Sequence, residues 1–131
     1  MFYYMSNQLL EFKEIIRSKH VSNTRKPDKQ TRKLLLYLFT STRGGFTRLR
    51  IIVHLLERPY NTHQLAQTLD LDYKAVQHHM KILEKNNMVS KIGEKYGAIF
   101  HLSNFLELNI HTLEEAIDKL DRKMNQKKIY L

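Results

Sequence analysis

The sequence predicts a mainly α-helical fold that carries one small β-hairpin. Apolar residues recur with helical spacing over most of the 131-residue chain. The pattern changes to strand-like runs only after Asn86-Asn87, and the four glycines and two prolines stand at the joints between predicted elements. A chain of this length is the size of one domain and can bury a core without disulfides.

Three helices are predicted in the first half of the chain. Residues 7–20 place Leu9, Phe12 and Ile16 on one side, as an amphipathic helix does. Residues 28–41 are apolar on all sides at their centre, a pattern typical of a helix buried on two sides, so this helix is a candidate for contact with a partner subunit. In residues 46–58, leucine, isoleucine and valine are expected to face the core, and Arg48 and Glu57 to face outward.

The next two helices are predicted to be short and joined by a tight turn. Asn61 and Gln64 have the spacing of a reciprocal cap at the start of a helix over 61–69. Asp72 is expected to cap a second helix over 73–86, so only Asp70 and Leu71 remain for the turn between them.

A strand pair follows, from Val89 to Ile92 and from Ala98 to Leu102, joined through residues 93–97. We expect Phe100 and Leu102 to face inward, and Ile99 and His101 to be more exposed. Two helices, a short turn and then a hairpin are the parts of a winged helix-turn-helix, in which the second helix enters the major groove of DNA and the hairpin forms the wing.

The helix over 73–86 supplies the predicted base-reading surface. Val76, Met80 and Leu83 are expected to face inward, which leaves a polar face on the opposite side. Glutamine can pair with adenine, whereas lysine and histidine can donate to guanine or to phosphate. A solvated helix face is the alternative explanation of this pattern. The predicted base-contacting residues are Tyr73, Lys74, Gln77, His78 and Lys81.

Contacts to the DNA backbone are predicted from three places. The start of the helix over 61–69 offers backbone amides to a phosphate, and arginines flank the double glycine. The wing carries basic and aromatic residues that can hold the flanking backbone or enter the minor groove, although a solubilising turn would look similar. The predicted residues are Arg43, Arg48, Thr62, His63, Gln64, Lys91, Lys95 and Tyr96.

The C-terminal segment shows an apolar stripe spaced four, three, four, three and four residues apart, as in a short coiled-coil seam. This stripe is predicted to form a dimer contact; the alternative is that it packs on its own domain. A helix that restarts at Thr112, with Glu115 as its capping partner, would interrupt the seam. The predicted dimerisation residues are Leu106, Ile110, Leu113, Ile117, Leu120 and Met124.

These patterns divide the chain into an N-terminal helical extension (1–27), a winged helix-turn-helix domain (28–103) and a C-terminal dimerisation helix (104–131). The net charge of +9 favours a polyanionic partner. Its excess lies in the first half, with five basic and two acidic residues in 1–27 and seven and two in 28–60.

Composition excludes several classes of site. Without cysteine the chain has no disulfide, no thiolate metal site and no cysteine nucleophile. His111, Glu114 and Glu115 have a spacing that could bind metal, but such triplets are usually solvent-exposed, so we predict no metal and no cofactor. No signal peptide, membrane span or catalytic motif is visible, which predicts a cytoplasmic protein that is neither an enzyme nor a membrane protein.

Residues 42–103 resemble the archaeal winged-helix transcription regulators of the ArsR-like group. The resemblance rests on the RGG turn, RPYN before the first short helix, LDYKAVQHHMKILEKNN and the YGAIFHLS strand. It implies a homodimer that binds double-stranded DNA at a pseudo-palindromic operator. Three alternatives remain: a protein-interaction or RNA-binding module, a metal-responsive repressor, and a protein bound at a membrane surface through its basic, aromatic N-terminus.

Overall fold

The computed structural model describes residues 2–19, 26–41, 43–93 and 97–130. The chain forms two compact units, and the boundary between them differs from the predicted segments. One unit, the terminal unit, consists of residues 1–46 and 109–131. The other, the winged unit, consists of residues 47–108. Residues 28–46, which the sequence assigned to the winged domain, therefore belong with the terminal helices.

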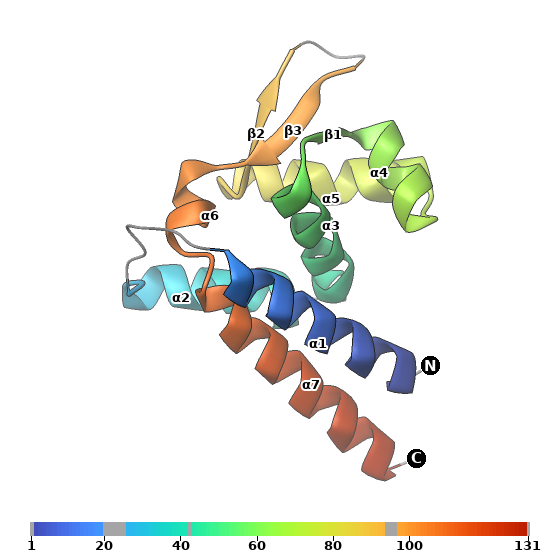
Figure 1. The fold of residues 1–131 in the computed structure, drawn as a ribbon, viewed down its shortest axis with the longest axis vertical. Helices are drawn as coiled ribbons and strands as arrows, with labels where there is room; N and C mark the ends of the chain where they lie inside the picture. The colour runs from blue at the N-terminus through green and yellow to red at the C-terminus, as the bar shows by residue number, and fades with distance from the viewer. Residues whose placement is uncertain (1, 20–25, 42, 94–96, 131) are drawn as a thin grey trace. The chain divides into compact units, whose positions relative to one another are not determined.

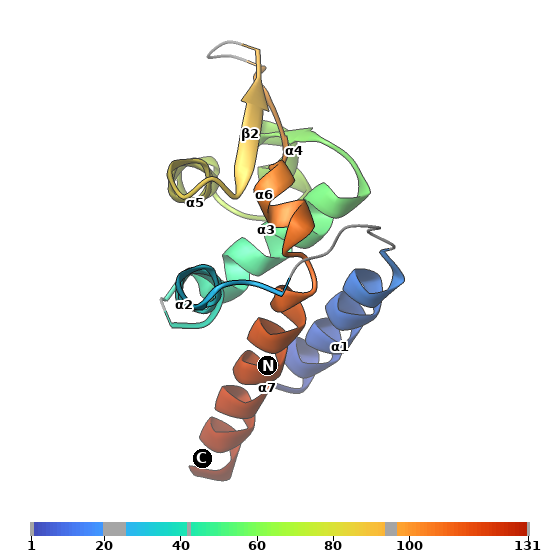
Figure 2. The same ribbon diagram turned by 90° about the vertical axis from the view of Figure 1, so that its left-hand side faces the viewer.

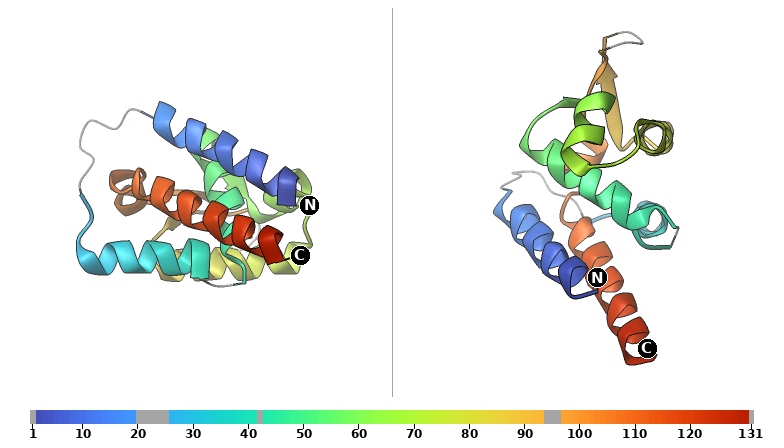
Figure 3. Two further views of the ribbon diagram at one scale, coloured as in Figure 1. Left: turned by 90° about the horizontal axis from the view of Figure 1, so that it is seen from below. Right: turned by 90° about the vertical axis from the view of Figure 1, so that its right-hand side faces the viewer.

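Two antiparallel helices dominate the terminal unit. Helix α1 (Phe2–Ser18) runs alongside α7 (Thr112–Tyr130), as the blue and red helices in Figures 1 and 3 show. Lys13 Nζ lies 2.6 Å from Asp118 Oδ1, and Arg17 Nε lies 3.4 Å from Glu114 Oε2. The inward face predicted for the first helix is confirmed, because Leu9, Phe12 and Ile16 are all buried.

The helix predicted over 28–41 changes its winding part-way. It begins as α2 (Lys29–Leu36), whose cap Asp28 accepts a hydrogen bond from the Thr31 amide at 2.7 Å, and continues as the π-helix η1 (Tyr37–Ser41). Gly45 opens α3 (Gly45–Glu57) beside this turn, and a Cβ atom there would stand 2.6 Å from Phe39 O. A glycine is therefore required by a close approach of two backbones.

The winged unit contains the predicted pair of short helices. Asn61 caps α4 (Thr62–Leu69): its side chain accepts from the Gln64 amide at 2.7 Å, and Gln64 Oε1 accepts from the Asn61 amide at 2.9 Å. Asp70 ends α4 with a left-handed backbone (φ 53°), and α5 (Tyr73–Lys85) begins after Asp72, which forms no side-chain cap. Figure 2 shows α5 end-on beside strand β2.

The hairpin is confirmed and gains a third strand. Strands β2 (Val89–Ile92) and β3 (Ile99–Leu102) are antiparallel, with Ile92 opposite Ile99, and project as the wing in Figure 1. The two-residue strand β1 (Tyr60–Asn61) pairs with the other edge of β3, which gives the order β1-β3-β2. Sequence analysis missed β1 because two residues show no alternation. Phe100 and Leu102 are buried and Ile99 is exposed, as expected.

The C-terminal stripe does not form one continuous exposed seam. Helix α6 (Asn104–Leu108) ends, and α7 restarts at Thr112, so the seam is interrupted as the capping pattern allowed. All six predicted dimerisation residues are at most 9% exposed within a single chain: Leu106, Ile110, Leu113, Ile117, Leu120 and Met124. The prediction that they face a second chain is therefore wrong for this structure, because the stripe is covered by its own chain. Within the terminal unit, α1 packs along α7.

No helix among the described residues is long and apolar enough to cross a membrane.

Candidate nucleic-acid interface

Helix α5 separates apolar from polar side chains as its sequence predicts. Val76, Met80 and Leu83 are buried and hold the helix to the winged unit. Every predicted base-contacting residue is exposed, and Tyr73 at the helix start is 44% exposed. The structure thus presents one polar strip along a well-anchored helix, consisting of Tyr73, Lys74, Gln77, His78 and Lys81.

A groove of about 500 Å³ lies between α5, the start of α4 and the wing. Its floor is apolar, from Met80, Ala98 and Phe100, and its rim is polar. We call it the α5–wing groove. The polar residues that line it are Asn61, Thr62, His63, Tyr73, Gln77, Lys81, Glu84 and Lys91.

The structure brings together six of the predicted site residues around this groove. Thr62 and His63 come from α4, Tyr73, Gln77 and Lys81 from α5, and Lys91 from the wing. Lys74 and His78 are exposed on α5 but do not line the groove. Among the lining residues, sequence analysis missed Glu84 as a site residue, although it stands seven positions after Gln77 and so lies on the same face of the helix.

Glu84 gives the groove an acidic component. Its Oε2 lies 3.9 Å from Lys91 Nζ, so the carboxylate on α5 reaches toward the cation on β2. Both side chains are about two-fifths exposed, which makes this a weak, solvent-screened pair. In the protein without DNA, the positive charge of Lys91 on the wing is therefore partly compensated by the Glu84 carboxylate.

The start of α4 offers fewer donors than the sequence suggested. The amide hydrogen and side-chain oxygen of Gln64 are both used in the capping box with Asn61. Gln64 therefore keeps only its side-chain NH2 group as a donor for a phosphate, whereas the backbone amides of Thr62 and His63 take no part in the capping box. Of these residues, His63 is exposed.

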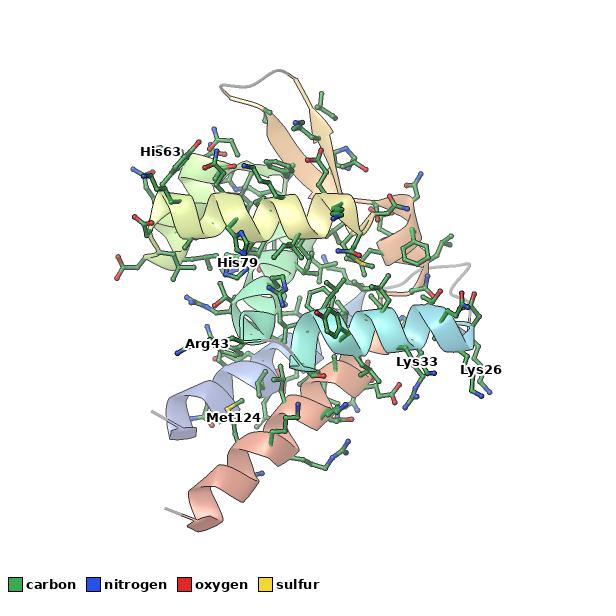
Figure 4. The ribbon with its side chains drawn as sticks, turned by 180° about the vertical axis from the view of Figure 1, so that it is seen from behind. Lys26, Lys33, Arg43, His63, His79 and Met124 are labelled. Atoms are coloured by element: carbon green, nitrogen blue, oxygen red, sulfur yellow. The ribbon has the colours of Figure 1, made fainter. Side chains whose placement is uncertain are left out.

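Arg48 is the clearest correction among the predicted site residues. Instead of facing outward toward a phosphate, it is 3% exposed, and its Nη1 lies 3.2 Å from Nδ1 of His79 on α5. Helix periodicity alone could not show that α5 packs on this side of α3. His79 is half-buried, and Figure 4 shows it on the side of α5 that faces α3.

Two kinds of backbone-contact prediction remain. Arg43 is exposed and belongs to the terminal unit. Lys95 and Tyr96, which were predicted from the sequence as wing contacts, lie outside the described residues.

The histidine and glutamates considered for metal binding have other partners. His111 Nδ1 lies 3.8 Å from Glu114 Oε1, whereas Glu115 accepts from Arg32 Nε at 2.9 Å. Within the described parts of the chain, no three histidine, aspartate or glutamate side chains are grouped as metal ligands would be.

Part of the chain matches a protein-family model. Residues 46–91 match the model described as "Bacterial regulatory protein, arsR family". This range covers α3, both short helices and the first wing strand. The fold is mainly helical and contains a winged helix-turn-helix with a three-stranded antiparallel sheet and additional N- and C-terminal helices; the match to the arsR model is confined to residues 46–91. The matching model describes regulatory proteins.

Two solved structures of HlyU from Vibrio cholerae N16961 are similar to this chain. The reduced form is 21% identical, with 72% of this chain and 90% of that chain covered and a TM-score of 0.49. The other HlyU structure is 19% identical, with 75% and 97% covered and the same TM-score. No curated protein sequence matches the chain. The archaeal part of the predicted resemblance gains no support, because the matching family is described as bacterial.

Proposed function

We propose that this protein is a sequence-specific regulator of transcription that binds double-stranded DNA with α5 in the major groove. The observation that carries the proposal is the polar strip on α5. Its side chains are exposed together, while the opposite face of the same helix is anchored in the core. A rigid helix with donors and acceptors on its outer face is what direct reading of base edges requires.

The surroundings of the strip fit a duplex. Thr62 and His63 stand at the start of α4, where backbone amides favour an anion, and Lys91 stands on the wing. With α5 in the major groove, these groups would contact the flanking phosphates and fix the position of the protein without choosing a sequence. Such a target would place the protein in the cytoplasm.

We further propose a homodimer on a pseudo-palindromic site, as the resemblance implies. Since the C-terminal stripe is covered, the dimer would use other surfaces of the terminal unit. Leu10 on α1 and Tyr37 on η1 are both 58% exposed, and Tyr37 lies in the segment that the sequence marked as the alternative interface. Sedimentation of Leu10→Glu and Tyr37→Glu would test this, and a wild-type protein that sediments as a monomer at micromolar concentration would contradict it.

The DNA proposal is tested by selection from a random duplex library with the purified full chain. We expect an enriched sequence whose two halves mirror each other. The logarithm of the binding constant should fall linearly with the logarithm of the salt concentration, with a slope of about −0.9 for each phosphate contact. Competition with single-stranded and structured RNA provides the control. Preferential binding of RNA, or no enriched sequence, would contradict the proposal.

A further inference from the structure

A partly buried hydrogen bond joins α5 to α3 in the winged unit. Arg48 on α3 is 3% exposed, and its guanidinium Nη1 lies 3.2 Å from Nδ1 of His79. His79 stands directly after His78, whose side chain belongs to the exposed strip, and the two rings are 5.8 Å apart. The bond therefore acts on α5 one residue away from a predicted base contact.

The chemistry of the two groups fixes the state of the histidine. A guanidinium has donors only, so Nδ1 of His79 must accept, and the ring proton must stand on Nε2. Burial lowers the pKa of His79, and the positive charge of Arg48 and the neighbouring His78 lower it further. The neutral ring is thus the form that the folded protein favours at neutral pH.

We propose that Arg48, acting through His79, is a positioning residue that sets the rotation of α5 about its axis. This positioning makes the discrimination between DNA sequences depend on pH. The inference rests on the proposed DNA-binding function. When His79 takes up a proton, Nδ1 becomes a donor that faces another donor, and two like charges meet at a partly buried site. The α3–α5 connection is then lost, and α5 no longer holds its side chains in one orientation.

The expected pH response has a definite sign. Because the folded protein holds the pKa of His79 below its ordinary value, the connection is intact at neutral pH and is lost as the pH falls through that lowered pKa. Acidification should therefore weaken the preference for the selected duplex.

The test measures the ratio of affinities for the duplex selected by the wild type and for a random duplex of equal length, at about pH 7.5 and about pH 5. Two variants of nearly equal shape provide the comparison. His79→Asn keeps an acceptor close to the Nδ1 position and cannot titrate, whereas His79→Leu has no acceptor. Arg48 has further interactions of its own, so substitution at His79 isolates the pair better than substitution at Arg48. Circular dichroism at each pH establishes that the proteins are folded.

We expect the wild-type ratio to fall about tenfold on acidification, the effect of one charge-assisted hydrogen bond. His79→Asn should keep the neutral-pH ratio at both pH values, and His79→Leu should show the reduced ratio at both. Equal pH responses in the wild type and His79→Asn, or an undiminished ratio in His79→Leu, would overturn the inference. A wild type that binds no duplex at neutral pH would instead overturn the proposed function, and the inference with it.

Discussion

The cations that pack against α7 in the terminal unit have different surroundings from those on α5 in the winged unit. In the terminal unit, Lys13, Arg17 and Arg32 are each paired with a carboxylate on α7. In the winged unit, Lys74 and Lys81 on α5 are exposed and form no ion pair with any residue that the structure describes. Lys91 on the wing is intermediate between these two groups, because its Nζ lies 3.9 Å from Glu84 Oε2.

This difference changes the meaning of the net charge. Counted along the sequence, the positive excess lies in the first half, and the predicted reading helix stands in a nearly neutral stretch. In the fold, several of the N-terminal cations are neutralised by acidic residues about 80 to 105 positions later in the chain. Positive charge that is exposed and unpaired on a helix attracts a polyanion, and Lys74 and Lys81 on α5 provide such charge in the winged unit.

The largest expected effect concerns the α7 stripe. Leu113→Ala should lower the free energy of unfolding by about 2–5 kcal/mol, because Leu113 is fully buried and its loss leaves a cavity. Chemical denaturation at several protein concentrations measures this. A variant that keeps its stability but dissociates from dimer to monomer would restore the stripe as an intermolecular seam.

The cap of α4 should have the next largest effect. Asn61→Ala removes the acceptor of the Gln64 amide and should cost about 1 kcal/mol of unfolding free energy. Asn61→Asp is the matched control, since aspartate also caps helices and should retain most of the stability. Equal stability of the wild type and the alanine variant in thermal unfolding would contradict the structural role of this cap.

A crossed pair of lysine substitutions tests the comparison itself. Lys13→Ala should cost about 1 kcal/mol of stability or less and leave the salt dependence of DNA binding unchanged. Lys91→Ala should leave the free energy of unfolding within about 0.5 kcal/mol of the wild-type value. It should reduce the slope of the logarithm of affinity against the logarithm of salt concentration by about one unit. If Lys13→Ala reduced the slope equally, the distinction between structural and DNA-facing cations would fail.

Local signals made the helix-turn-helix predictable. The Asn61–Gln64 capping pair, the two-residue turn and the apolar spacing of Val76, Met80 and Leu83 act within a few residues, so the sequence contains them directly. The same holds for the wing strands, where alternation placed Phe100 inward. These elements carry every predicted residue that lines the α5–wing groove.

The incorrect predictions concern contacts between distant segments. Arg48 seemed to face solvent because nothing near it in the sequence shows that α5 packs on that side of α3. Similarly, a stripe that suits a partner subunit also suits α1, and spacing cannot distinguish the two. Strand β1 depends wholly on its pairing with β3. Each of these requires knowledge of tertiary neighbours.

The central claim is that the exposed strip on α5 reads DNA bases, and Gln77→Ala tests it most directly. Gln67→Ala is the matched control, because Gln67 is also exposed but stands on α4 and does not line the groove. Gln77→Ala should reduce the discrimination between the selected and the random duplex by about 1–3 kcal/mol, whereas Gln67→Ala should leave it unchanged. If the two variants retain the same discrimination as the wild type, α5 is not the helix that reads the sequence.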